Sequence, residues 1–276
     1  MIEQSSKKVI IFDIGGYFSG INTNWSENIL QKIEMIVEDT ENGHQKYENT
    51  KTSIPIISVA RSPLKDNEDF LVGQSILFSA DVILREQEIL LQYLKCSVMG
   101  YGKIGKSISF HLLRRGIKPN VFDINPIKRV EAYNNLCLIP TKNKIIGDSD
   151  IIFCATGNKS LDVNDFRKLK DGCFVISVTS SDDEFHFDFE NSEYQINEKN
   201  KVYKYSNNAN FFYLVNNGNA VNFLHNAVMG DFIHLVRTEM ILAITERDTF
   251  TSQRNINYVS DHLRKKIAAL WIDIFS

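Results

Sequence analysis

Residues 100–105 read Gly-Tyr-Gly-Lys-Ile-Gly, and this stretch decides the fold. An apolar run at residues 94–99 leads into it, and an amphipathic run at residues 104–113 follows it. A strand, a glycine-rich turn and a helix in this order form the dinucleotide-binding fingerprint of α/β domains. We therefore predict that this segment binds a dinucleotide.

Each glycine of the fingerprint has a predicted task. Gly100 permits the tight turn after the strand, Gly102 lets a pyrophosphate approach the backbone, and Gly105 lets the helix pack closely on the sheet. The N-terminus of the helix offers N–H groups and a partial positive charge to the phosphates. Residues 100–107 also match the P-loop pattern, but the inner glycines fit a dinucleotide better than a nucleoside triphosphate.

A carboxylate ends the next predicted strand, at residues 120–123. Asp123 lies 18 residues after Gly105, close to the spacing of the acid that binds the adenosine ribose hydroxyls. A carboxylate there repels a 2′-phosphate, so the pattern favours NAD over NADP. Lys128 and Arg129 follow closely and weaken that preference.

Strand and helix patterns alternate along the chain. The predicted strands cover residues 8–13, 54–59, 94–99, 120–123, 151–154 and 173–178. The predicted helices cover residues 26–36, 72–91, 104–113, 163–169, 224–245 and 258–275. This alternation indicates the α/β fold class with a doubly wound parallel Rossmann sheet. The polar stretch at residues 184–224 predicts one or two antiparallel hairpins instead.

Composition excludes several function classes. The 276 residues are 43% hydrophobic, and the net charge of −3 comes from intermixed acids and bases. The chain has no basic stripe of the kind that binds nucleic acid. It also has no apolar run of membrane-spanning length and no signal-peptide pattern, so we expect a cytoplasmic protein that binds neither nucleic acid nor membrane.

Four cysteines are present, and none of them forms a Cys-x-x-Cys pair: Cys96, Cys137, Cys154 and Cys173. Three of the four lie in apolar, strand-like runs. We therefore expect buried free thiols in a reducing compartment and no metal site.

Further motifs, taken in order, extend the nucleotide-binding pattern to almost the whole chain. They are Asp-Ile-Gly-Gly at 13–16, Glu-Asp-Thr-Glu-Asn-Gly at 38–43, Val-Gly-Gln-Ser at 72–75, Ala-Thr-Gly-Asn at 155–158 and Gly-Asn-Ala-Val-Asn at 218–222. The series resembles the S-adenosylhomocysteine hydrolase family, which has DDGG, EETTTG, GTGQS, TTTGN and GRLVNL segments at these places. A 2-hydroxyacid dehydrogenase shares the glycine turn but does not explain the other segments.

The resemblance implies an NAD domain inserted into a second, smaller α/β domain. We expect the NAD domain at residues 75–228, and a substrate-side domain formed by the two chain ends at residues 1–74 and 229–276. The chain begins near the family's DDGG strand, so it is expected to lack the large N-terminal part and to be a truncated member. It is also expected to lack the tail that, in the family, enters a neighbouring subunit. We expect either a homodimer or another protein partner, whose identity stays open.

The family's cofactor contacts carry over by position. The phosphate turn is matched by Gly100, Gly102, Lys103, Ile104 and Gly105, and the ribose acid by Asp123. The resemblance implies further contacts at two strand ends, at the turn on the nicotinamide side and at a late asparagine: Ala155, Thr156, Gly157, Val178, Thr179, Ser180, Thr40 and Asn222.

The substrate side departs from the family. The family oxidises a ribose hydroxyl with NAD, eliminates a thiol, adds water and returns the hydride, which requires several acid and base groups. The second aspartate of DDGG is Ile14 here, and two histidines are replaced by Ser180 and Met229. Asp39 conservatively replaces a glutamate.

The family's lysine and aspartate before the long helix have no certain counterparts here. One alignment puts Pro63 and Asn67 at these positions, and another puts Arg61 and Asp66 there. Lys65 lies close to these positions in the sequence, and it is a further candidate for a base that has moved from the family's position. We therefore take Asp39, Lys65 and Asp66 as the candidate catalytic residues, with Asp182, Glu184 and His225 as further titratable groups.

Two functional hypotheses follow. In the first, the protein uses NAD for redox chemistry on a small polar or nucleoside-like substrate and does not hydrolyse S-adenosylhomocysteine. In the second, it is a non-catalytic, NAD-binding regulator or partner subunit. The polar segment at residues 184–210 then offers a contact surface through its aromatic residues, unless these pack as an ordinary sheet edge: Phe185, Phe187, Phe189 and Tyr194.

Overall fold

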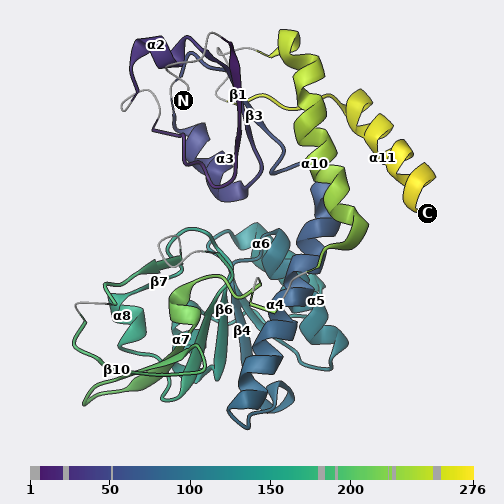
Figure 1. Ribbon diagram of the computed structural model, residues 1–276. Helices are drawn as coiled ribbons and strands as arrows, with labels where there is room; N and C mark the ends of the chain where they lie inside the picture. Colours follow the sequence, from purple (N-terminus) through teal and green to yellow (C-terminus); the bar gives the residue numbers. More distant parts are fainter. Residues whose placement is uncertain are drawn as a thin grey trace. The chain divides into compact units, whose positions relative to one another are not determined.

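The computed structural model of the chain describes residues 7–20, 25–50, 52–179, 184–189, 192–222, 224–225, 228–250 and 256–276. The chain forms two compact units (Figure 1). One unit joins Met1–Glu68 to Met229–Ser276, and the other is the continuous segment Asp69–Val228. Both units combine helices with a sheet.

The continuous unit is built on a seven-stranded sheet. Its strands lie side by side in the order β10 (Gln195–Lys199), β11 (Val202–Ser206), β12 (Phe211–Val215), β8 (Cys173–Ser177), β6 (Ile151–Cys154), β4 (Cys96–Met99) and β5 (Asn120–Phe122). The pairs from β12 to β5 are parallel, whereas β10, β11 and β12 are antiparallel. The predicted Rossmann sheet and the predicted hairpins are confirmed, and the hairpins extend the main sheet.

The strand order reverses at β4. The chain leaves β4, forms the helix α5 (Lys103–Arg114), and adds β5 on one side of β4. It then returns to place β6 on the other side of β4. Ligands of doubly wound sheets bind outside the carboxyl ends of the strands at such a reversal. The glycine turn after β4 and the loop after β6 both lie at this edge.

Helices and inward-facing side chains complete this unit. The helix α4 (Asp66–Glu86) buries apolar residues at helical spacing, among them Ile76, Ala80 and Ile83. The strands β4, β6 and β8 are buried on both faces, as parallel strands between two helix layers are. The described part of this unit also contains α6 (Pro126–Asn134), α7 (Lys142–Asp148), α8 (Val163–Phe166) and the parallel pair β7 (Leu161–Asp162) and β9 (Phe185–His186).

The two chain ends form the second α/β unit, as predicted. Its parallel sheet has the order β1 (Val9–Asp13), β2 (Ile33–Glu38) and β3 (Ile56–Ser58). The α-helices among its described residues are α2 (Glu27–Leu30), α3 (Glu41–Glu48), α10 (Ile233–Leu242) and α11 (Asp261–Phe275). Val37 and Ile57 of the sheet share a core with Val236 and Met240 of α10, so both ends of the chain contribute to one core.

Two predicted helices differ from those in the structure, whereas the cysteines are as expected. The helix predicted at residues 26–36 is wrong at its second half, because residues 33–38 form the strand β2, which is nearly all buried. The late helix predicted from residue 224 begins only at Ile233, after a 3-10 turn. All four cysteines are free and buried, as expected, and burial raises the pKa of the Cys96 thiol to about 12.

Candidate functional site

The three glycines of the turn after β4 differ in what surrounds them. Gly100 has a φ of +92°, and a Cβ there would lie 2.6 Å from the carbonyl oxygen of Ala155. A Cβ on Gly105 would lie 2.1 Å from the carbonyl oxygen of Gly100. A Cβ on Gly102 would meet no atom of the described chain within 4 Å. The protein itself therefore requires glycine at two positions, whereas at Gly102 the glycine leaves open space.

The helix α5 begins at this turn. Gly102 is its N-cap and, as a glycine, supplies no side-chain cap. Asp123 lies at the end of β5, and its carboxylate accepts hydrogen bonds from the backbone N–H groups of Tyr101 at 2.7 Å and Asn125 at 2.8 Å. The arrangement places a helix N-terminus beside a half-buried carboxylate, which suits a diphosphate and a ribose.

The loop after β6 borders the glycine turn. The N–H of Ala155 donates to the carbonyl of Met99 at 2.8 Å. Gly157 has a φ of +60°, which turns the chain away from the strand. Val178 is buried and Thr179 half-buried beyond the end of β8, while Ser180 lies outside the described residues.

Two other predicted contacts have distinct surroundings. The Nζ of Lys103 lies 3.4 Å from the Oδ2 of Asp69, and Ile104 is half-buried. Asn222 is 8% exposed, and its Oδ1 is buried without a hydrogen-bond partner in the described part of the chain. A buried acceptor of this kind needs a donor. The NH₂ of a carboxamide such as that of NAD would supply one, and together with the space at Gly102 this fits the dinucleotide.

In the other unit, a buried carboxylate organises the turn at residues 38–43. Glu38 is fully buried and accepts hydrogen bonds from the N–H groups of Gly15, Gly16 and Thr40 and from the Thr40 hydroxyl. Thr40 in turn caps α3 by accepting from the N–H of Gly43 at 3.0 Å. The Thr40 hydroxyl is therefore engaged within its own turn, and its predicted contact with the cofactor stays a prediction.

Two of the candidate catalytic residues lie side by side. The Nζ of Lys65 is 2.7 Å from the Oδ1 of Asp39 and 3.5 Å from the Oε1 of Glu68. The side chain of Lys65 is 9% exposed, and that of Asp39 is 17% exposed. Asp66, the third candidate, is the exposed first residue of α4. The structure therefore pairs Lys65 with Asp39, and Glu68 is a neighbour that the sequence did not indicate.

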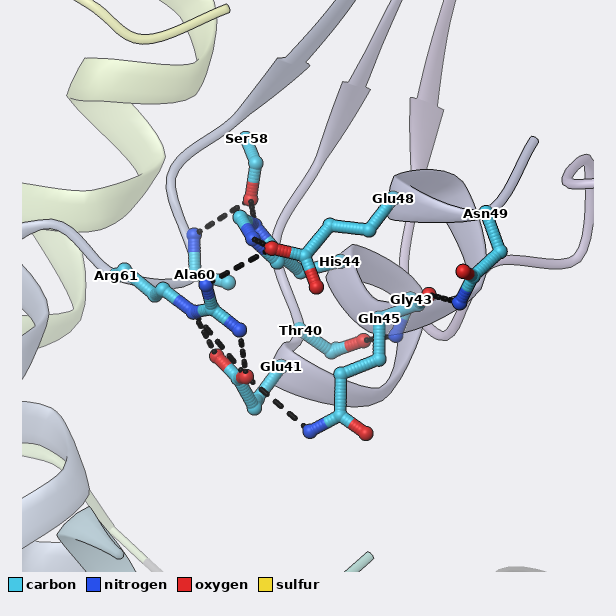
Figure 2. Close-up of polar contacts among 10 residues, drawn as sticks. All are labelled: Thr40, Glu41, Gly43, His44, Gln45, Glu48, Asn49, Ser58, Ala60 and Arg61. Atoms are coloured by element: carbon cyan, nitrogen blue, oxygen red, sulfur yellow. Dashed lines mark hydrogen bonds and ion pairs between the residues drawn. The ribbon is translucent and has the colours of Figure 1, made fainter. Parts of the chain in front are cut away.

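Arg61, which one alignment places at the family's lysine position, belongs to a different cluster, drawn in Figure 2. Its guanidinium contacts the Glu41 carboxylate through Nε and Nη2, with a shortest distance of 2.6 Å, and Nη1 lies 3.1 Å from Glu48. Behind it, the buried ring of His44 lies between the Ser58 hydroxyl and Glu48. These carboxylates raise the pKa of Arg61, so this side chain stays charged and does not act as a base.

The remaining residues that the sequence singled out differ in burial and in hydrogen bonding. Glu184 is fully buried within a hydrogen-bonded cluster. The Nδ1 of His225 is buried without a partner in the described chain, and its ring packs 6.2 Å from that of Phe78. Ile14 is 61% exposed. Asp182 lies outside the described residues.

The aromatic residues of residues 185–194 pack on one another and on the core rather than forming a free surface. The ring centroid of Phe166 lies within 5.5 Å of those of Phe185, Phe187 and Phe189. The ring of Tyr194 packs 5.2 Å from that of Phe212. These rings therefore pack as part of the core at the edge of the sheet. This is the second of the two alternatives for this segment, not the contact surface.

Comparisons with known proteins agree with this geometry. The sequence signature described as the S-adenosyl-L-homocysteine hydrolase NAD binding domain matches residues 72–228. An adenosylhomocysteinase of Thermotoga maritima is 28% identical over 176 residues, which are 61% of this chain and 43% of that protein. The chain thus spans less than half of the length of this curated relative. No helix among the described residues is long and apolar enough to cross a membrane.

Solved structures were compared as well. A formate dehydrogenase from Staphylococcus aureus in complex with NAD has a TM-score of 0.48 at 12% identity, over 63% of this chain and 58% of that one. An L-alanine dehydrogenase has a TM-score of 0.43 at 13% identity, over 98% of this chain and 93% of that one.

Proposed function

Because this chain belongs to the S-adenosyl-L-homocysteine hydrolase family through its NAD-binding domain, we propose that it performs NAD-dependent redox chemistry on a small polar or nucleoside-like substrate. We also propose that it does not hydrolyse S-adenosylhomocysteine. NAD, the predicted cofactor, is the ligand of this domain family. The substrate and the reaction are the proposal.

The observation that carries the proposal is the contact between Lys65 and Asp39. Both side chains are largely withdrawn from water and lie 2.7 Å apart. Surface ion pairs contribute little and are common, but a lysine enclosed by two carboxylates has lost most of its hydration. Such a pair supports a chemical role more strongly than the exposed Asp66 does.

The pair suits the proton part of an alcohol oxidation. NAD, when bound, accepts a hydride from a carbon that carries a hydroxyl group. The hydroxyl proton must leave at the same time, so that a ketone results. Lys65 can give one proton to Asp39, to which it is already hydrogen-bonded, and the resulting neutral amine can then accept the hydroxyl proton of the substrate. The reverse transfer would protonate a ketone oxygen during reduction.

The hydrolase cycle needs more groups than this pair. Elimination of the thiol and addition of water require further acids and bases, each typically worth about 10²–10⁴ in rate. Ile14, an exposed apolar side chain, stands where the family has an aspartate. Met229 stands where it has a histidine. These replacements support a redox step without elimination.

The test uses the full chain loaded with NAD. A panel of polar alcohols and ketones, including nucleosides, is screened by the absorbance of NADH. For a substrate that reacts, Lys65→Met should lower kcat by about 10²–10⁴ and leave the affinity for NAD unchanged. The matched control is Lys265→Met, which makes the same change at an exposed lysine of α11 in the same unit. An unchanged kcat in Lys65→Met would refute the assigned role.

The non-catalytic alternative has one observation in its favour, the loss of acid and base groups at Ile14 and Met229. It predicts NAD that stays oxidised against every compound in the panel, together with a protein partner that copurifies. Turnover of any compound in the panel, abolished by Lys65→Met, would exclude it.

A further inference from the structure

We propose that Glu184 is a positioning residue of the NAD site: its carboxylate holds the loop after β6 and the end of β8 in the conformation that binds the cofactor. Glu184 has no exposed surface. The sequence predicts it only as a titratable group, and its burial excludes direct contact with solvent in the described structure.

Both carboxylate oxygens of Glu184 are used. Oε2 accepts from the hydroxyl of Thr156 at 2.7 Å, and Oε1 accepts from the N–H of Gly157 at 2.7 Å and from the hydroxyl of Thr179 at 3.0 Å. These three donors belong to segments whose residues are predicted to contact the cofactor. One side chain thus connects the ends of two neighbouring strands.

The loop that Glu184 holds has a demanding shape. Gly157 has a φ of +60°, and the hydroxyl of Thr156, besides donating to Glu184, accepts from the N–H of Asn158 at 3.0 Å. A turn of this kind exposes backbone N–H groups, and a carboxylate that accepts from one of them fixes its orientation.

The loop also borders the phosphate turn. The carbonyl oxygen of Ala155 lies so close to Gly100 that a Cβ there would be 2.6 Å away. A shift of the loop would therefore move the surface on which the pyrophosphate is expected to lie. Because protein interiors are close-packed, such a shift is transmitted rather than absorbed.

The cost of burying this carboxylate argues for a role. Burial of an ionised carboxylate is expensive, and apolar residues of similar volume stabilise a core equally well. Within the described chain, two hydroxyls and one amide compensate Glu184, and no cation pairs with it. The three donors keep the carboxylate aligned, which an apolar core residue would not do.

The test compares Glu184→Gln with Ser160→Ala in the full chain. The Ser160 hydroxyl donates to the backbone carbonyl of Glu184 at 3.0 Å, so its removal perturbs the same buried cluster but not the carboxylate. Calorimetric titration with NAD, well below both unfolding midpoints, should give a Kd raised about tenfold in Glu184→Gln and less than about twofold in Ser160→Ala.

A second variant keeps the proposal testable if Glu184→Gln does not fold. Glu184→Asp keeps the carboxylate but shortens the side chain by one methylene group, so the carboxylate no longer reaches all three donors and the Kd for NAD should rise about threefold or more. The proposal is overturned if Glu184→Gln folds and binds NAD like wild type. It is also overturned if Glu184→Asp binds NAD like wild type.

Discussion

The backbone N–H of Tyr101 donates a hydrogen bond of 2.7 Å to the Oδ2 of Asp123. The glycine turn after β4 is thereby tied to the end of β5, and the predicted ribose acid also holds the predicted phosphate turn. Since the other oxygen of Asp123 accepts from the N–H of Asn125, the carboxylate is aligned before any ligand arrives.

This relationship leads to a prediction about cofactor choice. Asp123→Ala should weaken NAD binding by about tenfold, because a charge-assisted hydrogen bond to the ribose is lost. The same change should weaken NADP binding less, because the repulsion of the 2′-phosphate is removed as well. Titration of the variant with both nucleotides measures the ratio. If both affinities fell by the same factor, Asp123 would act only through the turn.

Alanine substitution should lower NAD affinity at Gly102 and protein stability at Gly105. In Gly102→Ala the new methyl meets no protein atom within 4 Å of the described chain, so thermal stability should be nearly unchanged while NAD affinity falls sharply. In Gly105→Ala the methyl would lie 2.1 Å from the carbonyl oxygen of Gly100, so overpacking should cost about 1–3 kcal/mol of stability. Thermal unfolding and NAD titration of both variants separate the two effects. Full NAD affinity in Gly102→Ala would place the pyrophosphate elsewhere.

The unpaired Oδ1 of Asn222 predicts a dependence on the nicotinamide group. Asn222→Ala should weaken NAD by about fivefold, the typical value of one hydrogen bond. ADP-ribose, which lacks the nicotinamide ring, should bind the variant and the wild type equally. A common loss for both ligands would show that Asn222 acts on the adenosine half or on the fold.

Glu38 predicts a pH effect on stability. Burial raises the pKa of Glu38, although hydrogen bonds from Thr40 and Gly15 oppose the shift. A carboxyl whose folded pKa lies above its unfolded value contributes most to stability below the ordinary glutamate pKa. This contribution is lost as the pH rises through the raised folded value. The unfolding midpoint of the wild type should therefore fall more steeply over that window than that of Glu38→Gln, and parallel profiles would contradict the assignment.

Much of the fold could be predicted from the sequence because a strand pattern precedes the glycine turn and a helix pattern follows it. Gly100 and Gly105 are required by contacts within the protein, and those contacts exist only in a strand–turn–helix unit. The strand β2 was missed because a strand buried on both faces shows no alternation, and an apolar run such as residues 33–38 also fits a helix. The helix α6 was missed although Asn125 caps it and Pro126 occupies its first position, both of which are recognised start signals.

Less of the candidate site could be predicted from the sequence. The alignments placed either Arg61 or Pro63 at the family's lysine position, with Lys65 nearby, and sequence spacing alone did not choose among the three. Burial and contact distinguish them: Arg61 pairs with α3, whereas Lys65 turns toward Asp39. Glu184 was named as a possible acid or base, and its hydrogen bonds to two strand ends depend on loop conformations that residue spacing does not reveal.

The most direct measurement of the central claim is the release of homocysteine from S-adenosylhomocysteine by the full chain, after bound NAD has been confirmed in the same sample. A thiol reagent detects the product continuously. We expect NAD to be present and no thiol to be released above the rate of a heat-denatured control. Release at a rate typical of the family, abolished by Lys65→Met, would contradict the claim that the hydrolase reaction has been lost.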